Sequence, residues 1–370
     1  MDVQLRGTGG PAGWPQPGCR CASCSRATRA GVARAPADVL IDQILRITGP
    51  RPTAPPPGYR AEPVSGGLEI TAPDASRLLW AAGPGAVPKP PEQAAPYDAA
   101  LLDVLGDPAQ LGALRRRGLV TEATTVAAIH IDHRVPSQQE LARRCRLWRV
   151  TQVADGGHLT VRASWPPGGP QSHESPAPWR VLLLGGARSG KSREAELRLA
   201  GEPEVTYVAA AGRAAADDAA WADRVAAHRS RRPGWWRTVE TTDVAAVLRA
   251  ATGAVLIDSI GTWLAAVMDE CGAWHRREDE GESESESEGT ATSSLARRIG
   301  ELIGAWRDTS GRVVAVSDEA GSGVVPGTES GRMFRDELGR LNQLLAAESE
   351  EAILVVAGRV LPLPGLAESC

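Results

Sequence analysis

The sequence predicts an α/β protein of two domains: a C-terminal domain with a mostly parallel sheet covered by helices on both faces, and a smaller, β-rich α/β domain before it. Three observations predict this. The chain has 370 residues, more than one ordinary core needs. A stretch rich in Pro, Gly and Ser, residues 164–178, separates two regions that differ in their pattern of apolar residues. After it, short apolar runs alternate with helical patterns, which is typical of parallel sheets.

We therefore expect an N-terminal domain over residues 1–163, a linker over 164–178 and a C-terminal domain over 179–370. Inside the C-terminal domain, residues 275–294 form an acidic, serine-rich run. Such a run cannot supply a hydrophobic core, so we expect a disordered insertion there.

The individual elements follow from the apolar pattern. Strands of the C-terminal domain are expected at 180–184, 204–210, 254–258, 312–317 and 352–358. Helices are expected at 214–229, 295–306 and 334–348. The N-terminal domain has shorter strand candidates between Pro- and Gly-rich turns, at 66–72, 76–83, 97–104 and 124–132.

Charge and hydropathy exclude several classes of partner. The formal net charge is −4, which indicates no polyanion partner such as nucleic acid. No apolar run approaches the roughly 20 residues that span a bilayer. The N-terminus lacks the basic start and apolar stretch of a secretory signal. We expect a cytoplasmic protein.

A phosphate-binding motif follows the first C-terminal strand. The stretch "GGARSGKS" fits the pattern G-x-x-x-x-G-K-[ST] and comprises Gly185, Gly186, Ala187, Arg188, Ser189, Gly190, Lys191 and Ser192. Glycines let backbone N–H groups surround phosphates, the lysine reaches the β- and γ-phosphates, and the serine hydroxyl is a Mg²⁺ ligand. Only Lys89 and Lys191 are lysines in this arginine-rich chain. The alternative is a structural glycine-rich turn, but the strand before and the helix after favour a P-loop nucleotide site.

Such a site needs an acid on a neighbouring strand to organise the metal. Asp258 stands at the carboxyl end of the expected strand 254–258, where open sheets bind ligands. The alternative for Asp258 is a helix-capping role.

The motifs "GGARSGKSREAE", "YVAAAG", "DRVAAHRSRRPGWWRTVE", "VLIDSIGTWL" and "DEAGSGVVPGTESGRMFRDELGRLNQ" occur in an order and spacing that resemble one family. That family is the bifunctional adenosylcobinamide kinase / adenosylcobinamide-phosphate guanylyltransferases, and the resemblance covers about residues 179–360. It implies phosphorylation of adenosylcobinamide with ATP or GTP and Mg²⁺. It further implies transfer of GMP from GTP to that phosphate through a histidine–GMP intermediate, and self-association of the chain.

The residue that matches the family's nucleophile is His228. A neutral imidazole is a competent nucleophile toward an α-phosphorus. The residues after it, Arg229, Ser230, Arg231 and Arg232, supply charge for phosphate. Glu240 matches a family acid near the guanine nucleotide. Without the resemblance, His228 is equally well a histidine at a helix end.

Further motif positions carry weaker expectations. Gly321, Gly323 and Pro326 are expected to form a rigid loop over the cobinamide phosphate, while Arg332, Arg335 and Asp336 share a helix face or form a solvated salt-bridge face. The sequence also departs from the family. The family's Asn-Glu-Val-Gly is Asp318-Glu319-Ala320-Gly321 here, and an acidic pair is shifted to Asp217 and Asp218.

The N-terminal stretch "LRGTGGPAGWPQPGCRCASCSRA" resembles that of metallo-β-lactamase-fold phosphodiesterases, over about residues 3–155. "VAAIHIDHRVPS" is similar to their His-x-His-x-Asp-His metal motif, but its first histidine is Ala128, which leaves His130, Asp132 and His133. The half that carries the other metal ligands is missing. The resemblance therefore implies a degenerate, truncated domain kept for packing or assembly as a scaffold. The alternative is a metal-dependent phosphodiester hydrolase with a regulatory P-loop domain.

Three of the six cysteines cluster in "GCRCASC". Cys19, Cys21 and Cys24 are candidates for a structural Zn²⁺ site, with a fourth ligand from His158, His173 or Cys145. The alternative is three reduced thiols.

Overall fold

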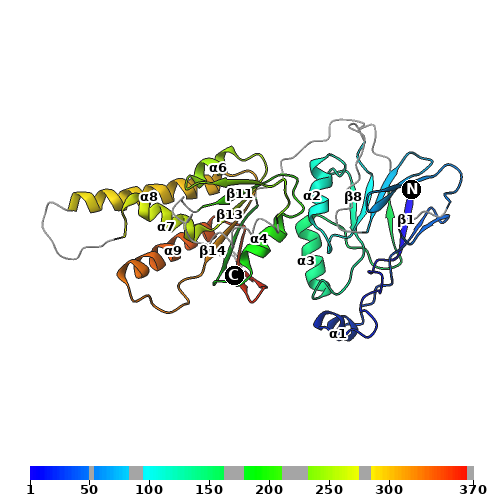
Figure 1. The fold of residues 1–370 in the computed structure, drawn as a ribbon, viewed down its shortest axis with the longest axis horizontal. Coiled ribbons are helices and arrows are strands. Elements are labelled where there is room, and N and C mark those ends of the chain that lie inside the picture. The colour runs from blue at the N-terminus through cyan, green and yellow to red at the C-terminus, as the bar shows by residue number, and fades with distance from the viewer. Residues whose placement is uncertain (50–53, 83–94, 162–178, 211–231, 275–284, 365–370) are drawn as a thin grey trace. The chain divides into compact units, whose positions relative to one another are not determined.

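The structure is a computed structural model that describes residues 1–49, 54–82, 95–161, 179–210, 232–274 and 285–364 (Figure 1). The chain divides into two compact units. One consists of Met1–Ser172 with Arg198–Pro203, and the other of His173–Leu197 with Glu204–Cys370. Each unit is described below by itself.

The second unit is built on a seven-stranded sheet with the order β12-β11-β13-β14-β10-β15-β16. Every pairing in it is parallel except the hairpin of the last two strands. The strands are β10 (Trp179–Gly185), β11 (Val205–Ala209), β12 (Arg237–Glu240), β13 (Ala254–Asp258), β14 (Arg312–Asp318), β15 (Glu351–Val356) and β16 (Arg359–Leu363). The mostly parallel sheet predicted from the sequence is thereby confirmed.

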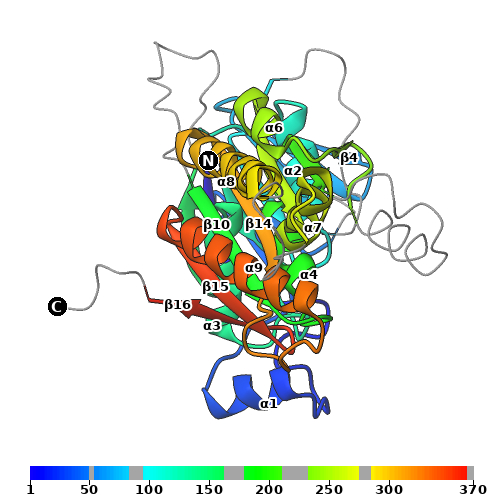
Figure 2. The ribbon, with the colours of Figure 1, turned by 90° about the vertical axis from the view of Figure 1, so that its left-hand side faces the viewer.

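Helices cover both faces of this sheet. They are α4 (Lys191–Leu199), α6 (Val244–Ala250), α7 (Ile260–Cys271), α8 (Ser285–Asp308) and α9 (Glu329–Ala347). Side chains of α6, α7, α8 and α9 pack against one face of the sheet in a single core cluster. The strands contribute Leu182, Ile257 and Ala315, among others, to this cluster. Figures 1 and 2 show α4 on the opposite side of the strands from α7 and α9. The continuous apolar strands therefore have both faces buried.

The acidic run over residues 275–294 is described only in part. Residues 275–284 lie outside the described part of the chain, but α8 begins at Ser285 and includes the second half of the run. The amphipathic pattern of residues 295–306 provides a packed helix, which residues 285–294 extend toward its N-terminus. The disorder expected for the insertion stays a prediction.

The first unit contains two sheets, with the orders β3-β2-β1-β9 and β4-β5-β6-β7-β8. Their strands are β1 (Asp2–Gly7), β2 (Asp38–Ile41), β3 (Leu45–Ile47), β4 (Arg60–Val64), β5 (Gly67–Thr71), β6 (Arg77–Ala81), β7 (Ala99–Leu102), β8 (Thr125–Ala128) and β9 (Gly157–Thr160). One core cluster contains side chains of both sheets, among them Leu5, Val39, Leu78 and Leu101, so the sheets pack face to face.

Three helices complete the first unit: α1 (Ala22–Arg29), α2 (Ala109–Arg116) and α3 (Gln138–Trp148). Figure 1 shows α2 and α3 beside β8, on the side away from β1. The four strands predicted here are present as β5 to β8, although β8 ends at Ala128 rather than Asp132. The expected helix over 214–229 lies outside the described residues.

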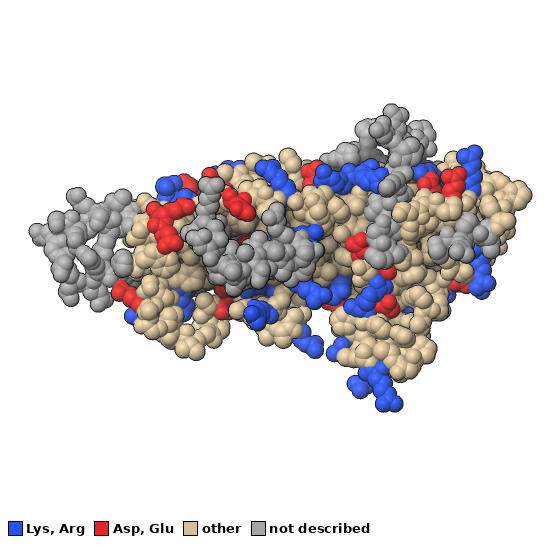
Figure 3. Space-filling view, in the orientation of Figure 1, with Lys and Arg blue, Asp and Glu red and all other residues tan. Residues whose placement is uncertain are grey.

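Among the described residues, no helix is both long and apolar enough to cross a membrane. On the face shown in Figure 3, acidic and basic side chains are interspersed in both units.

Candidate active site

The glycine-rich turn joins the end of β10 to the start of α4 in a tight path. A Cβ atom on Gly185 would lie 2.5 Å from the carbonyl oxygen of Val355 and 2.6 Å from the Ser189 hydroxyl oxygen. Gly190 has a φ of +101°, a conformation that L side chains rarely adopt. Both glycines are therefore required by the backbone path. The turn ends at Lys191, the first residue of α4, so the positive end of that helix lies at the turn.

The Lys191 ammonium group is held over this turn by two oxygen atoms. Its Nζ lies 2.7 Å from Oδ1 of Asp318 and donates a 3.1 Å hydrogen bond to the carbonyl oxygen of Gly186. The lysine side chain is 12% exposed, whereas that of Asp318 is 43% exposed. The positive charge is therefore close to the turn, where a phosphate would bind, and Asp318 currently pairs with it.

Ser192 and Asp258 form the second half of the site. The Ser192 hydroxyl donates to Oδ1 of Asp258 at 3.3 Å, and the Tyr207 hydroxyl donates to Oδ2 of the same carboxylate at 3.0 Å. A hydroxyl and a carboxylate are the oxygen ligands that Mg²⁺ takes in phosphate sites. The donor set of Ser192 and Asp258 therefore fits Mg²⁺. Burial and the Asp258 charge raise the pKa of Tyr207 above its ordinary value, so its hydroxyl stays a donor.

The sheet register explains why these residues meet. Gly185 is in register with Asp318 on β14, and Ala209 on β11 is in register with both Asp258 and Glu240. All of these pairs are parallel, so the carboxyl ends of the strands form one edge of the sheet. Glu240 lies at the far end of that edge, four strand spacings from β10 or roughly 19 Å. The structure therefore brings Asp258 to the phosphate loop but not Glu240.

Two buried polar side chains fix the end of β14 and were not singled out in the sequence. Ser317 donates to Oδ1 of Asn342 at 2.6 Å, and Nδ2 of Asn342 donates to the carbonyl oxygen of Asp318 at 3.1 Å. Asn342 belongs to α9 and is 6% exposed. Its position in an amphipathic helix gives no signal of this role, because the partner strand is far away in sequence.

The predicted nucleophile and its neighbours are only partly described. His228, Arg229, Ser230 and Arg231 lie outside the described residues, as do Asp217 and Asp218. Arg232 is described, and its guanidinium carbon lies 3.5 Å from the centre of the Tyr207 ring. One end of the predicted arginine cluster therefore contacts the side chain that bonds to Asp258.

The loop between β14 and α9 contains the predicted Gly321, Gly323 and Pro326. Arg332 donates to the carbonyl oxygens of Pro326 and Gly327 at 3.2 and 3.0 Å, which ties the loop to the first turns of α9. Arg335 pairs instead with its neighbour Asp336 at 2.9 Å. The three charged residues all lie on α9, but Arg332 alone supports the loop.

Comparison with known proteins gives a family for this unit. The model of the family described as "Cobinamide kinase / cobinamide phosphate guanyltransferase" matches residues 181–363. The "Bifunctional adenosylcobalamin biosynthesis protein CobP" of Pseudomonas aeruginosa is 40% identical over 192 residues, which cover 98% of that protein and 50% of this chain. The chain belongs to this family.

A second curated relative is similar to about half of this chain as well. The "Bifunctional adenosylcobalamin biosynthesis protein CobU" of Salmonella typhimurium is 36% identical over 183 residues, covering 96% of that protein and 48% of this chain. The family match begins at residue 181, so Met1–Ser172 of the first unit lie before it, while Arg198–Pro203 lie within it.

Two solved structures also align with parts of the chain. Zn²⁺-bound PqqB from Methylobacterium extorquens has a TM-score of 0.31 and 15% identity and covers 44% of this chain and all of its own. The P4 protein of bacteriophage phi6 with ADP has a TM-score of 0.24 and 18% identity, covering 56% of this chain and 62% of its own. At these TM-scores the likeness identifies no fold.

By the resemblance described for the sequence, Asp318 stands where the family's motif has asparagine, and its ion pair with Lys191 leads us to expect that it competes with phosphate for the ammonium group. We expect Asp318→Asn to bind ATP about 2- to 10-fold more tightly, because the Lys191–Asp318 ion pair no longer has to break. A titration with a fluorescent ATP analogue measures this. Asp308→Asn, at the end of α8, is the matched control. Unchanged or weaker binding would contradict the competition, and weaker binding would indicate that Asp318 helps to hold the bound nucleotide.

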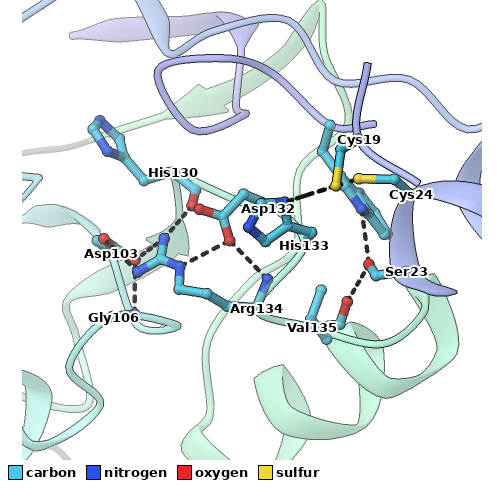
Figure 4. A network of polar contacts seen from close by, with 11 residues as sticks. Cys19, Ser23, Cys24, Asp103, Gly106, His130, Asp132, His133, Arg134 and Val135 are labelled. Atoms are coloured by element: carbon cyan, nitrogen blue, oxygen red, sulfur yellow. Dashed lines mark hydrogen bonds and ion pairs between the residues drawn. The ribbon is translucent and has the colours of Figure 1, made fainter. Parts of the chain in front are cut away.

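The first unit gathers three thiols and one imidazole. The ligand atoms of Cys19, Cys21, Cys24 and His133 all lie within 4.8 Å of one another. Nδ1 of His133 is 3.9 Å from the sulfur atoms of both Cys19 and Cys24 (Figure 4). Burial raises the pKa of Cys24 to about 11, while the backbone N–H of Cys24 lowers the pKa of Cys21. Three cysteines and one histidine are a ligand set of structural zinc sites.

The fourth member of this cluster differs from the three candidates named from the sequence. His158 pairs with Asp2 at 3.3 Å, and Cys145 is buried, with its thiol pKa raised to about 11 by that burial. His173 lies outside the described residues. His133 takes the place instead, because the loop after β8 carries it away from the other residues of its motif and against the cysteines.

The remaining residues of the His-x-Asp-His motif surround an arginine. Arg134 bonds to Asp132 at 2.8 Å and to both carboxylate oxygens of Asp103 at 3.1 Å, and it donates to the carbonyl oxygen of His130 at 2.8 Å (Figure 4). A Cβ atom on Gly106 would lie 2.5 Å from this guanidinium group. The Arg134 guanidinium group thus supplies the positive charge between the carboxylates of Asp103 and Asp132. A side chain larger than that of glycine at position 106 would occupy the same space.

His130 itself is turned away from that arginine. Its ring packs edge-on against Trp80, with 5.8 Å between ring centres, and burial lowers its pKa below the ordinary value. His130 therefore sits as a neutral ring against the core. This arrangement does not favour the phosphodiester hydrolase alternative, because His130, Asp132 and His133 have three different environments.

Proposed function

We propose that the chain phosphorylates the aminopropanol hydroxyl of adenosylcobinamide with ATP or GTP and then transfers GMP from GTP to the new phosphate, giving adenosylcobinamide-GDP. The observation that carries this proposal is the meeting of Lys191, Ser192 and Asp258 at one edge of the sheet, in a chain of the cobinamide kinase / guanyltransferase family. The curated relatives are named as bifunctional adenosylcobalamin biosynthesis proteins, which supports two activities on one chain.

In the kinase step, the substrate hydroxyl oxygen forms a bond to the γ-phosphorus, the nucleoside diphosphate leaves, and the hydroxyl proton is released to water. Lys191 gathers the phosphate oxygens after releasing Asp318, and backbone N–H groups of residues 186–190 surround them. Ser192 and Asp258 would hold Mg²⁺, which supplies positive charge for the β- and γ-phosphate oxygens. The chain's own contribution is therefore position and charge.

In the guanylyl step, we assign the nucleophile to His228. The lone pair of its imidazole nitrogen forms a bond to the α-phosphorus of GTP, and pyrophosphate leaves. A phosphate oxygen of adenosylcobinamide phosphate then attacks the same phosphorus and releases the histidine. Arg229, Arg231 and Arg232 supply charge for these phosphates, and Glu240 contacts the guanine nucleotide. The family resemblance supports these roles, and it also supports self-association of the chain.

The direct test is to incubate the protein with adenosylcobinamide, GTP and Mg²⁺ and to analyse the products by mass spectrometry. We expect adenosylcobinamide phosphate first and adenosylcobinamide-GDP later, with release of pyrophosphate. Repeating the reaction with ATP and no GTP stops it at the phosphate. Formation of neither product would reject the proposal.

For the first unit, we propose a structural Zn²⁺ ion held by Cys19, Cys21, Cys24 and His133. The grouping of three thiols and an imidazole within 4.8 Å supports it. The cysteines lie at the start of α1 and His133 lies in the loop after β8, so a shared ion would join two segments 109 residues or more apart in sequence. The role of the unit would then be that of a stabilised scaffold in the same chain as the enzyme unit.

The purified protein is expected to carry about one zinc, which the triple substitution of Cys19, Cys21 and Cys24 by serine removes. Elemental analysis of gel-filtered protein measures the metal, and Cys145→Ser is the matched control because Cys145 lies outside the cluster. His133→Ala is expected to weaken zinc binding as well. A folded, metal-free wild type would rule out the site. Two metals with phosphodiester hydrolysis would instead support the hydrolase alternative.

A further inference from the structure

The two oxygen atoms of the Asp258 carboxylate have different partners. Oδ1 accepts from Ser192, at the start of α4, and Oδ2 accepts from Tyr207, on the neighbouring strand β11. Tyr207 is in parallel register with Leu256, and side chains two residues apart on a strand share a face. The strand pairing therefore places the Tyr207 side chain on the face of the sheet where the Asp258 carboxylate lies.

Tyr207 is a rigid donor. Its side chain is 6% exposed, and its hydroxyl group lies 3.0 Å from Oδ2. A buried ring has few alternative rotamers, and a buried phenol without its partner would leave a polar group unsatisfied. The hydrogen bond to Oδ2 therefore limits rotation of the carboxylate and keeps Oδ1 directed toward Ser192.

The ring of the same residue has a second contact. The Arg232 guanidinium carbon lies 3.5 Å from the ring centre, within the range of a cation–π interaction. Arg232 closes the arginine-rich segment that begins at Arg229. One tyrosine therefore contacts the carboxylate of the kinase half of the site with its hydroxyl and the basic segment of the guanylyl half with its ring.

We propose that Tyr207 is a positioning residue: its hydroxyl orients Asp258 toward the Mg²⁺–nucleotide, and its ring holds Arg232 beside it. This inference rests on the proposed function, because it assigns a role at that same site. Tyr207 acts through Asp258 and Arg232.

Tyr207→Phe tests the hydroxyl, since it removes one oxygen atom and keeps the ring under Arg232. The half-saturating Mg²⁺ concentration for binding of a fluorescent GTP analogue is expected to rise about 3- to 10-fold, because Asp258 is no longer held toward Ser192. Nucleotide binding in excess EDTA is expected to stay unchanged. Tyr59→Phe is the matched control, because Tyr59 donates a comparable 2.6 Å hydrogen bond to Asp42 in the first unit.

Arg232→Gln removes the arginine and its charge and leaves the Tyr207–Asp258 bond in place, so it shows which changes follow from loss of Arg232 itself. We expect it to lower the yield of GMP-labelled protein at low GTP while the Mg²⁺ dependence of nucleotide binding stays at the wild-type value. Tyr207→Leu, which removes both contacts, should show both changes if it folds, as checked by circular dichroism.

An unchanged Mg²⁺ dependence in Tyr207→Phe, in a protein that still makes both cobinamide products, overturns the positioning role and leaves the proposed function standing. A wild type that binds nucleotide without any effect of Mg²⁺ and makes no product overturns both. A Mg²⁺ shift in Tyr59→Phe as large as that in Tyr207→Phe would show a general effect of tyrosine loss and would also overturn the positioning role.

Discussion

The His228→Ala variant is expected to lose all covalent GMP labelling and guanylyl transfer while it still phosphorylates adenosylcobinamide. Wild-type protein incubated with radiolabelled GTP and Mg²⁺ alone should take up GMP and release pyrophosphate. The bond should be labile in acid and stable in base, as for a phosphoramidate. The variant lacks the only group that we assign as nucleophile, so its label should fall below detection.

The kinase step needs no covalent intermediate, so phosphorylation of adenosylcobinamide by His228→Ala should remain within about 3-fold of wild type. His275→Ala is the matched control, because His275 is the next histidine along the chain after His228. Label that persists in His228→Ala would move the nucleophile to another residue. A wild type without label, but with intact phosphorylation, would reduce the second unit to a kinase.

The predictable part of the fold was the part with a continuous apolar signal. Strands β10, β11, β13 and β14 are largely buried on both faces, β15 is buried mainly on one, and all five stand out as apolar runs. The edge strands β12 and β16 are mostly exposed and were missed, because β12 carries no such run and the short apolar run of β16 contains Pro362. The pairing of β15 with β16 depends on neighbours in space, which an apolar pattern does not reveal.

Some residues of the candidate site could be predicted from the sequence, and others could not. Lys191 and Ser192 are contiguous with the glycines that shape the loop, and Asp258 ends an apolar strand, so a local pattern found them. Tyr207 looks like an ordinary strand residue in sequence. Its role depends on the register between β11 and β13, which brings together residues 51 positions apart.

His133 illustrates the limit of a motif. The sequence grouped it with His130 and Asp132, because the three are spaced as metal ligands. In the structure His130 has a φ of +57° and packs on Trp80, whereas His133 contacts cysteines more than 100 residues earlier in the chain. Spacing along a loop does not fix side-chain direction once the backbone leaves the strand.

The second prediction of large effect concerns Lys191. Lys191→Ala is expected to lower kcat/KM for phosphorylation of adenosylcobinamide by at least about 100-fold, because it removes the charge that gathers the β- and γ-phosphates in the transition state. The fold should persist. The lost ion pair is with Asp318, whose side chain is 43% exposed and is solvated by water when the lysine is gone.

A matched control exists in the chain itself. Lys89 is the only other lysine and stands outside the phosphate-loop motif in the sequence, so Lys89→Ala makes the same chemical change and should keep wild-type activity. Initial rates with ATP and with GTP, together with thermal melts of both variants, separate loss of chemistry from loss of fold. Because His228 and not Lys191 forms the covalent bond, residual GMP labelling in Lys191→Ala would indicate a separate GTP subsite for the guanylyl step. Full kinase activity in Lys191→Ala would contradict the assignment of residues 185–192 as the phosphate loop.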